Sequence, residues 1–136
     1  FELRKGVADY IERIKKQAHA KGYSETLFGR RRPCPDVKSS NYIIRSAAER
    51  AAVNMPLQGT AADMMKLAMI KIAQTLPKGA QMLLQIHDEL IVECNKGQEV
   101  EVAEVLRRDM LGVHAFKVPI EVNVSAGSSW GTLEAL

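Results

Sequence analysis

The sequence predicts an α+β fold in which about three helices pack on a small antiparallel sheet. Three segments have the apolar spacing or the composition of helices, and two short apolar runs, MLLQI and LIVEC, flank a polar turn as hairpin strands do. Apolar and polar residues also alternate over residues 120–124, which predicts a further strand in the same sheet. With 136 residues, 46% hydrophobic and 26% charged, the chain has the length and composition of one ordinary globular domain.

The first predicted helix carries apolar residues at the three-and-four spacing of a single helix face. Gly22 follows this helix at the position of a C-cap. From residue 22 to residue 41 the spacing is lost, and the stretch GYSETLFGRRRPCPDVKSSN is rich in Gly, Pro, Ser and Arg. We interpret this stretch as an irregular basic connector on the surface. The apolar residues of the helix are Val7, Tyr10, Ile11, Ile14 and Ala18.

A long second helix is expected from Ser46 to Leu76, because Ser-Ala-Ala-Glu has the form of a capping box and Ala-rich sequence follows it. Pro56 interrupts this segment, since proline lacks an N–H donor and clashes with the carbonyl one turn earlier. Both a kink and a break near residues 55–60 are compatible with the sequence, and Thr60 is placed to cap a new helix after a break.

After the long helix, the hairpin is expected to turn at residues 87–89. A third helix then ends at Gly112, and the last strand covers residues 120–124. The tail SAGSSWGTLEAL has the composition of a loop, and we expect Trp130 to fill part of the core. The third helix is predicted from the spacing of Val102, Ala103, Leu106 and Met110.

Charge is divided unevenly along the chain. Residues 1–50 hold 12 Lys+Arg against 6 Asp+Glu, a net charge of +6, whereas residues 51–136 hold 7 against 10, a net charge of −3. A basic region indicates a polyanionic partner, and an acidic region with grouped carboxylates indicates a cation site.

The cellular setting can be inferred from what the sequence contains. No apolar run approaches the roughly 20 residues that a membrane span needs, so we expect a soluble protein with no membrane partner. The two cysteines, Cys34 and Cys94, do not form the pattern of a disulfide framework or a zinc site, and reduced intracellular thiols are expected. The chain begins with Phe1 and lacks the apolar region of a secretory signal, so we expect it to be a piece of a longer protein.

Three ionisable residues, His87, Asp88 and Glu89, occupy the expected hairpin turn. Successive side chains of a strand point to opposite faces, so one of the two carboxylates is expected to bind a cation unless the turn rotates both toward it. Mg²⁺ prefers oxygen ligands and is commonly bound by one or two carboxylates together with substrate phosphates, as in phosphoryl transfer. A charged, solvated turn explains the same residues without a ligand, and the residues alone favour that simpler explanation.

Arg50, Asn54 and Gln58 are spaced four residues apart. On a helix they drift by only about 40° per step and form one polar stripe about 12 Å long. Asn and Gln can donate hydrogen bonds to the minor-groove acceptors of duplex DNA without reading its sequence. A solvent-facing stripe that binds nothing is the simpler explanation when spacing alone is considered.

The basic connector contains three consecutive arginines, Arg30, Arg31 and Arg32, between a glycine and a proline. Clustered guanidinium groups bind phosphates in a salt-dependent and sequence-independent way. A solubilising surface loop explains a single arginine run equally well, so both interpretations stay open at this point.

Three stretches, GYSETLFGRRR, RSAAERAAVNMPLQGTAADMMKLAM and MLLQIHDELIVE, resemble consecutive blocks near the C-terminus of family A DNA polymerases, the bacterial DNA polymerase I type. The similarity covers nearly the whole chain, and the last two blocks are specific to that family. It implies that QIHDELIVE is the motif C hairpin of the palm. It also implies a fingers portion with the basic loop in residues 1–45, and the long helix plus a palm portion in residues 46–136.

The resemblance implies roles for the candidate residues. Asp88 matches the palm carboxylate that binds the two catalytic Mg²⁺ ions, Glu89 matches its acidic neighbour, and His87 matches a residue near the primer terminus. The residues implied to contact DNA are Arg50, Asn54 and Gln58 for the primer-template duplex, and Arg30, Arg31 and Arg32 for a nucleic-acid strand.

The function implied by the resemblance is that of a DNA-directed DNA polymerase, a nucleotidyltransferase that extends a primer with deoxynucleoside triphosphates in DNA replication or repair. Its partners would be primer-template DNA and the triphosphates, and its location the bacterial cytoplasm, at the nucleoid. The family's other metal-binding aspartate and its nucleotide-binding Lys and Tyr have no match in this chain, so the chain alone is expected to be inactive. A non-catalytic nucleic-acid-binding module is the alternative, based on the basic first half.

Overall fold

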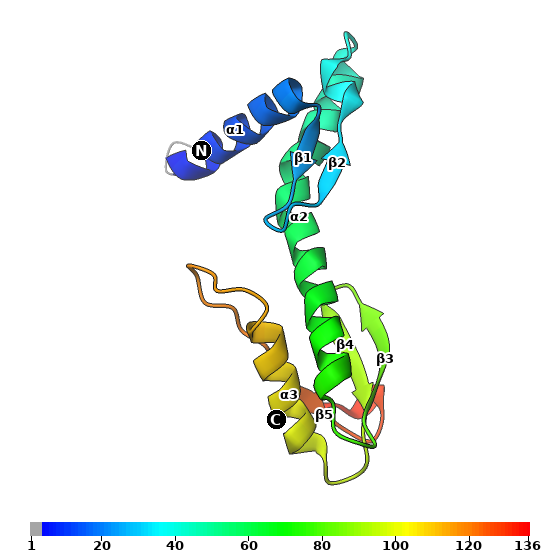
Figure 1. Cartoon of the computed structure of the whole chain (residues 1–136). Coiled ribbons are helices and arrows are strands. Elements are labelled where there is room, and N and C mark those ends of the chain that lie inside the picture. The colour runs from blue at the N-terminus through cyan, green and yellow to red at the C-terminus, as the bar shows by residue number, and fades with distance from the viewer. Residues whose placement is uncertain (1–3) are drawn as a thin grey trace. The chain divides into compact units, whose positions relative to one another are not determined.

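Three α-helices and three two-stranded antiparallel sheets make up the computed structural model, which describes residues 4–136 (Figure 1). This arrangement confirms the predicted α+β class. The chain divides by packing into a first unit, residues 1–61, and a second unit, residues 62–136. Residues 51–61 carry no charge, so the first unit keeps the net charge of +6 and the second the net charge of −3.

Helix α1, Lys5–Lys21, opens the first unit and buries Ile14 and Ala18. Gly22 ends the helix with a φ of 78°, and its N–H donates a hydrogen bond to the carbonyl of Ala18. Glycine adopts this left-handed conformation without the steric penalty of a Cβ atom. The predicted C-cap is therefore confirmed.

The predicted irregular connector is wrong, because the stretch contains a short hairpin and a 3-10 helix. Strands β1, Tyr23–Glu25, and β2, Arg31–Pro33, pair antiparallel, and η1, Pro35–Lys38, follows them (Figure 1). Each strand has three residues, too few for an alternating pattern to be seen in the sequence. The segment is also anchored in the core of the first unit, which consists of Ala18, Cys34, Val37 and Ala52.

Helix α2, Tyr42–Thr75, starts four residues before the predicted Ser46. The side-chain oxygen of Asn41 accepts hydrogen bonds from the N–H groups of Ile43, at 2.9 Å, and Ile44, at 3.4 Å. Asn41 therefore has the contacts of an N-cap, and Ser46 instead accepts a hydrogen bond from Arg50 inside the helix.

Pro56 lies inside α2, and the helix continues to Thr75 without a break. A proline at this position deprives the carbonyl of Ala52, four residues earlier, of its helical donor. The hydroxyl of Ser24 donates to that carbonyl instead, at 2.7 Å and away from solvent. Of the two alternatives for this region, the break is wrong.

The second unit combines the C-terminal turns of α2 with a hairpin and a third helix. Its strands β3, Gln81–Ile86, and β4, Glu89–Glu93, are followed by helix α3, Glu99–Leu111. The predicted hairpin and third helix are thus confirmed. The buried core consists of Ala68, Ile72, Val102 and Leu106, and hairpin residues packed against it include Met82, Leu90 and Val92.

The predicted strand at residues 120–124 is wrong. The strand in this region, β5, covers Ser125–Ala126 and pairs with β6, Glu134–Ala135, rather than with the β3–β4 hairpin. The predicted loop therefore contains β5, β6 and the 3-10 helix η2, Trp130–Thr132. Val122 and Val124 are half-buried, and Val124 packs against the core of the second unit, so the alternation reports burial although residues 120–124 do not form a strand.

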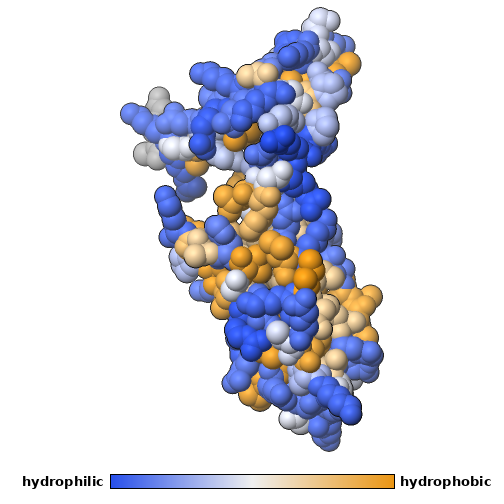
Figure 2. All heavy atoms as spheres, viewed as in Figure 1, coloured by the Kyte–Doolittle hydropathy of each residue, from blue (hydrophilic) through white to orange (hydrophobic). Residues whose placement is uncertain are grey.

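Trp130 is also placed differently from the prediction, since it is 59% exposed rather than buried. It belongs to a group of large apolar side chains that the second unit leaves open to solvent. On the face seen in Figure 2, hydrophobic residues gather over the second unit, whereas the first unit is mostly hydrophilic. Other exposed members of this group are Leu83, Leu84, Val118 and Leu136.

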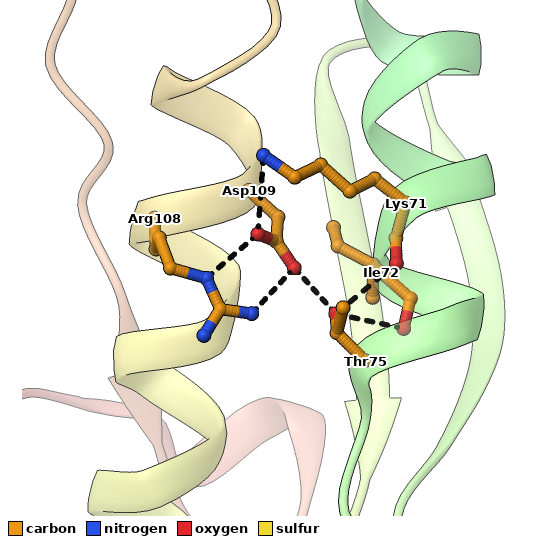
Figure 3. A network of polar contacts seen from close by, with 5 residues as sticks. All are labelled: Lys71, Ile72, Thr75, Arg108 and Asp109. Carbon is orange, nitrogen blue, oxygen red and sulfur yellow. Dashed lines mark hydrogen bonds and ion pairs between the residues drawn. The ribbon is translucent and has the colours of Figure 1, made fainter.

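A buried carboxylate joins α3 to the last turns of α2 (Figure 3). Asp109 is fully buried and accepts hydrogen bonds from Arg108, at 2.8 and 2.9 Å, and from the hydroxyl of Thr75. The ammonium group of Lys71 lies 3.5 Å from the same carboxylate. The hydrogen bonds from Arg108 outweigh the effect of burial and hold the pKa of Asp109 well below its usual range.

Helices long and apolar enough to cross a membrane are absent from the described part of the chain. Helix α2 has the necessary length, with 34 residues, but its longest stretch without charged side chains, residues 51–62, is shorter than the roughly 20 residues that a span needs.

Candidate active site and nucleic-acid interface

The β3–β4 hairpin presents three of the predicted site residues together. Gln85 pairs with Leu90 and Ile86 pairs with Glu89, so the connection consists of His87 and Asp88 alone. Glu89 is the first residue of β4, which makes the turn one residue shorter than predicted. Such a connection fixes the register of the two strands and holds the turn residues at their end.

The backbone of the turn has an uncommon conformation. His87 has a φ of 52° and is the only non-glycine residue with positive φ among residues 4–136. Two-residue hairpin turns require positive φ at their first central position, and histidine adopts such values more often than most non-glycine residues. The side-chain amide of Gln85 donates a hydrogen bond of 2.6 Å to the carbonyl of His87.

The side chains of His87, Asp88 and Glu89 are all exposed to solvent. Glu89 lies opposite Ile86 on the ladder, whereas Asp88 belongs to the turn itself. Two adjacent carboxylates at an open turn suit Mg²⁺, which takes one or two protein carboxylates and completes its coordination with water and phosphate oxygens. No group of three or more His, Cys, Asp or Glu residues placed to hold a metal ion occurs within residues 4–136. The residues therefore fit part of a magnesium site that needs further ligands.

The predicted polar stripe lies on α2 in the first unit. Arg50, Asn54 and Gln58 are all exposed, and the helix that carries them is not broken at Pro56. Their four-residue spacing therefore keeps them on one face of the helix. The guanidinium group of Arg50 donates to the hydroxyl of Ser46 at 2.9 Å, which leaves its other N–H groups for a further acceptor.

The three arginines of the basic segment differ in their surroundings. Arg30 lies in the turn, where its carbonyl accepts a hydrogen bond from the N–H of Thr26. Arg31 donates to the carboxylate of Glu25 at 2.5 Å, and its guanidinium lies 4.6 Å from the centroid of the Tyr23 ring. Arg32 is exposed and pairs through its backbone with Ser24, on the other face of the hairpin. Arg31 is therefore partly neutralised, whereas Arg32 is the more open cation.

The β1–β2 hairpin is attached to the side of α2 that faces away from the polar stripe. The N–H of Leu27 donates to the hydroxyl of Thr60 at 3.0 Å, and a Cβ atom on Gly59 would approach Thr26 to 2.5 Å. Ala52, Gly59 and Thr60 lie roughly half a helical turn from the middle of the stripe. The hairpin with Arg30–Arg32 and the stripe are thus on opposite sides of the helix and are not brought together.

Sequence reasoning missed Ser24, Gln85 and Asp109. Each of these residues makes a side-chain contact with the backbone or with another element. Such contacts cannot be predicted from the spacing or composition of the nearby sequence. Pro56 did signal that one carbonyl would lack a donor, but only the fold reveals that Ser24 supplies it.

Comparison with known proteins places these features in a family. Residues 1–132 match the family described as DNA polymerase family A. The chain belongs to this family, as the resemblance of its three sequence blocks implied.

Particular relatives are DNA polymerases I from bacteria. The chain is 49% identical over 131 residues to the thermostable DNA polymerase I of Thermus aquaticus, covering 96% of this chain and 16% of that protein. It is 45% identical over 129 residues to DNA polymerase I of Mycobacterium leprae, covering 93% of this chain and 14% of the relative. The chain thus spans only about a sixth of the length of these relatives.

A solved structure agrees with the fold. The POL domain of Pol1 from M. smegmatis, in a complex with a DNA primer-template and dNTP, is similar with a TM-score of 0.88 and 44% identity. The similarity covers 92% of this chain and 23% of that one. The α+β arrangement of helices and small antiparallel sheets is therefore that of part of a polymerase domain.

Proposed function

We propose that this chain is part of a DNA-directed DNA polymerase, a nucleotidyltransferase that adds deoxynucleotides to a primer 3′ end during DNA replication or repair. Membership of DNA polymerase family A supports the proposal, as does the similarity to a polymerase domain in complex with a DNA primer-template and dNTP. The observation that carries it is the exposed Asp88 at the two-residue turn of an antiparallel hairpin.

In this proposal Asp88 would hold Mg²⁺ for reaction with the incoming triphosphate. Two Mg²⁺ ions, when bound, would stabilise charge on the attacking and leaving oxygens of the phosphoryl transfer. Asp88 serves this role because it is exposed, while the paired strands on either side restrict the movement of its backbone. Glu89 adds negative charge beside it, and the family resemblance supports a role for His87 near the primer terminus.

The DNA contacts divide between one face of α2 and the β1–β2 hairpin. Arg50, Asn54 and Gln58 would meet the primer-template duplex, where amide groups donate to minor-groove acceptors shared by all base pairs. The arginines of the β1–β2 hairpin would contact phosphates. Because the hairpin is attached to the opposite side of α2, they would touch a different part of the nucleic acid.

We further propose that residues 1–45 belong to the fingers and residues 46–136 to the long helix and the palm. This functional division differs from the packing division after Ala61, because α2 runs through both units. The 136 residues alone are proposed to be inactive, since one turn with two carboxylates does not complete a magnesium site. The bacterial relatives support a location at the nucleoid in the bacterial cytoplasm.

The decisive experiment is Asp88→Ala in the polymerase of which this chain forms part. Primer extension should fall by about 10²–10³-fold or more, the scale for removal of one transition-state contact. The Kd for primer-template DNA should stay within about twofold, because Asp88 repels rather than attracts phosphates. Asp36→Ala, an exposed aspartate of η1, is the matched control and should leave both values unchanged. Undiminished extension by the Asp88 variant would remove this residue from the chemistry.

A second candidate function is a non-catalytic nucleic-acid-binding module, favoured by the net charge of +6 on the first unit. The complete coding sequence distinguishes the two. A preceding segment with an aspartate-bearing strand and a helix that carries Lys and Tyr supports the enzyme. An unrelated preceding domain, together with salt-dependent duplex binding by this chain alone, supports the module.

A further inference from the structure

The hydrogen bond from Gln85 to His87 acts on the peptide unit that precedes Asp88. The carbonyl of His87 and the N–H of Asp88 belong to one planar peptide group. A donor that holds this carbonyl therefore restricts rotation of the plane from which the backbone of Asp88 continues. At 2.6 Å the contact from the Gln85 amide is short for an N–H···O bond.

The turn needs such a restraint because its conformation is strained. The φ of 52° at His87 is outside the regions that non-glycine residues prefer, and it persists only where surrounding contacts favour it. Strand pairing fixes Ile86 and Glu89, but the two turn residues between them have no cross-strand partners. The amide of Gln85 supplies a contact to this otherwise unpaired stretch.

Gln85 is well placed to give this restraint. Its backbone pairs with Leu90, and Leu90 packs against the core of the second unit. The side chain of Gln85 is exposed and turns back toward the end of the hairpin. The backbone of Gln85 is thus fixed by strand pairing, while its side chain holds the carbonyl of His87 in the turn.

We propose that Gln85 is a positioning residue that orients the Asp88 carboxylate through the His87–Asp88 peptide. The inference rests on the proposed function of Asp88 as a magnesium ligand. Gln85 itself touches neither metal nor substrate in this proposal. Its contribution is to keep Asp88 in the orientation that binds the ion, so its loss weakens metal binding rather than DNA binding.

The test uses the polymerase of which this chain forms part. Gln85→Met keeps the length of the side chain and removes its N–H donors, and Gln85→Leu removes them with a different shape. Gln85→Asn keeps a neutral amide donor on a side chain that is one methylene shorter. Gln81→Met is the matched control, because Gln81 lies at the other end of the same hairpin and donates to Glu93 at 3.2 Å.

Mn²⁺ binding to the polymerase with primer-template DNA, followed by electron paramagnetic resonance, is the readout that does not depend on turnover. Gln85→Met and Gln85→Leu should weaken Mn²⁺ binding roughly tenfold, the equivalent of one net hydrogen bond. The Mg²⁺ concentration for half-maximal extension should rise by the same factor, while the Kd for DNA stays constant. Gln85→Asn should recover part of the loss, because it keeps a neutral donor, and Gln81→Met should resemble the unmodified enzyme.

The outcomes separate this inference from the function on which it rests. Unchanged Mn²⁺ binding in both donor-free variants overturns the positioning role, and so does a loss confined to DNA affinity, which would make Gln85 a DNA contact. Asp88→Ala is measured in parallel. If it abolishes extension while the Gln85 variants remain normal, only this inference fails. If it retains extension and Mn²⁺ binding, the proposed function fails as well.

Discussion

At the scale of single residues, Ser24 supplies the hydrogen bond that Pro56 cannot make. The Ala52 carbonyl is the acceptor that the N–H of residue 56 would serve in a regular helix, and the hydroxyl of Ser24 reaches it at 2.7 Å. Ser24 is 5% exposed, so water cannot easily replace it as donor. One hydroxyl thus allows a proline inside a 34-residue helix and at the same time attaches the β1–β2 hairpin.

This pairing predicts a coupled effect on stability. Ser24→Ala should lower the free energy of unfolding by about 1–3 kcal/mol, because it leaves a buried carbonyl without a donor. In a Pro56→Ala background the loss should be smaller, since residue 56 then has its own N–H. Denaturant unfolding of the two single variants and the double variant measures the coupling. Ser40→Ala, an exposed control, should change stability by less than about 0.5 kcal/mol, and additive losses would contradict the compensation.

At the scale of elements, Asp109 fastens α3 to the C-terminal turns of α2 (Figure 3). The carboxylate is fully buried, yet Arg108 and Lys71 bring positive charge to it from the solvent side. Thr75 adds a neutral donor from α2. Because all these donors favour the ionised form, the pKa of Asp109 is lowered in the folded state.

The lowered pKa of Asp109 sets the direction of a pH effect. A carboxylate whose pKa is lower in the folded than in the unfolded chain stabilises the fold at pH values above its unfolded pKa, about 3.9. This contribution is lost progressively as the pH falls from there toward the folded pKa. Asp109→Asn should therefore lower the free energy of unfolding at pH 7, by about 1–3 kcal/mol for charge-assisted hydrogen bonds.

Unfolding experiments between pH 7 and pH 2 measure this effect. Below pH ~4 the difference in the free energy of unfolding between the Asp109→Asn variant and the unmodified chain should shrink. The reason is that the stabilisation from the ionised Asp109 is lost progressively in this range. Asp36→Asn, on an exposed residue of η1, serves as the control. A difference that stays constant down to pH 2 would show that Asp109 contributes by packing rather than by charge.

At the scale of the whole chain, the two packing units differ in charge, with +6 on the first and −3 on the second. In the proposed function, the basic residues of the first unit would attract a polyanion and the acidic turn of the second would bind cations. Within the first unit, however, the net charge of +6 overstates how strongly the arginines would attract a polyanion. Arg31 is already paired with Glu25, whereas Arg32 remains open.

DNA binding should therefore depend on salt differently for neighbouring arginines. A protein loses about 0.9 from the slope of log K against log salt for each phosphate contact removed. Arg32→Ala in the polymerase of which this chain forms part should reduce the slope by about this amount. Arg31→Ala, the matched variant, should reduce it less, because the Arg31 guanidinium is already paired with Glu25 and so contributes less to phosphate binding. Titrations of duplex DNA at several salt concentrations measure both slopes, and equal reductions would contradict the difference between the two residues.

Sequence patterns alone predict the α+β class, helices α1 and α3, the β3–β4 hairpin and the membership of DNA polymerase family A. These features follow from apolar spacing, turn composition and motifs, which act over a few residues. The roles of Asp88, Glu89 and His87, and of the arginines and amides on the first unit, remain predictions based on that resemblance.

Three features could be found only in the folded chain: α2 continues through Pro56, the basic segment is a hairpin, and β5 pairs with β6 within the tail. Each of these depends on a partner far away in the chain or on a strand too short to show a pattern. Ser24 and Ala52 are 28 residues apart, and Thr75 and Asp109 are 34 apart. The local sequence shows which backbone groups will need a hydrogen-bond partner. It does not show which residue supplies that partner, because the donor comes within reach only in the packed chain.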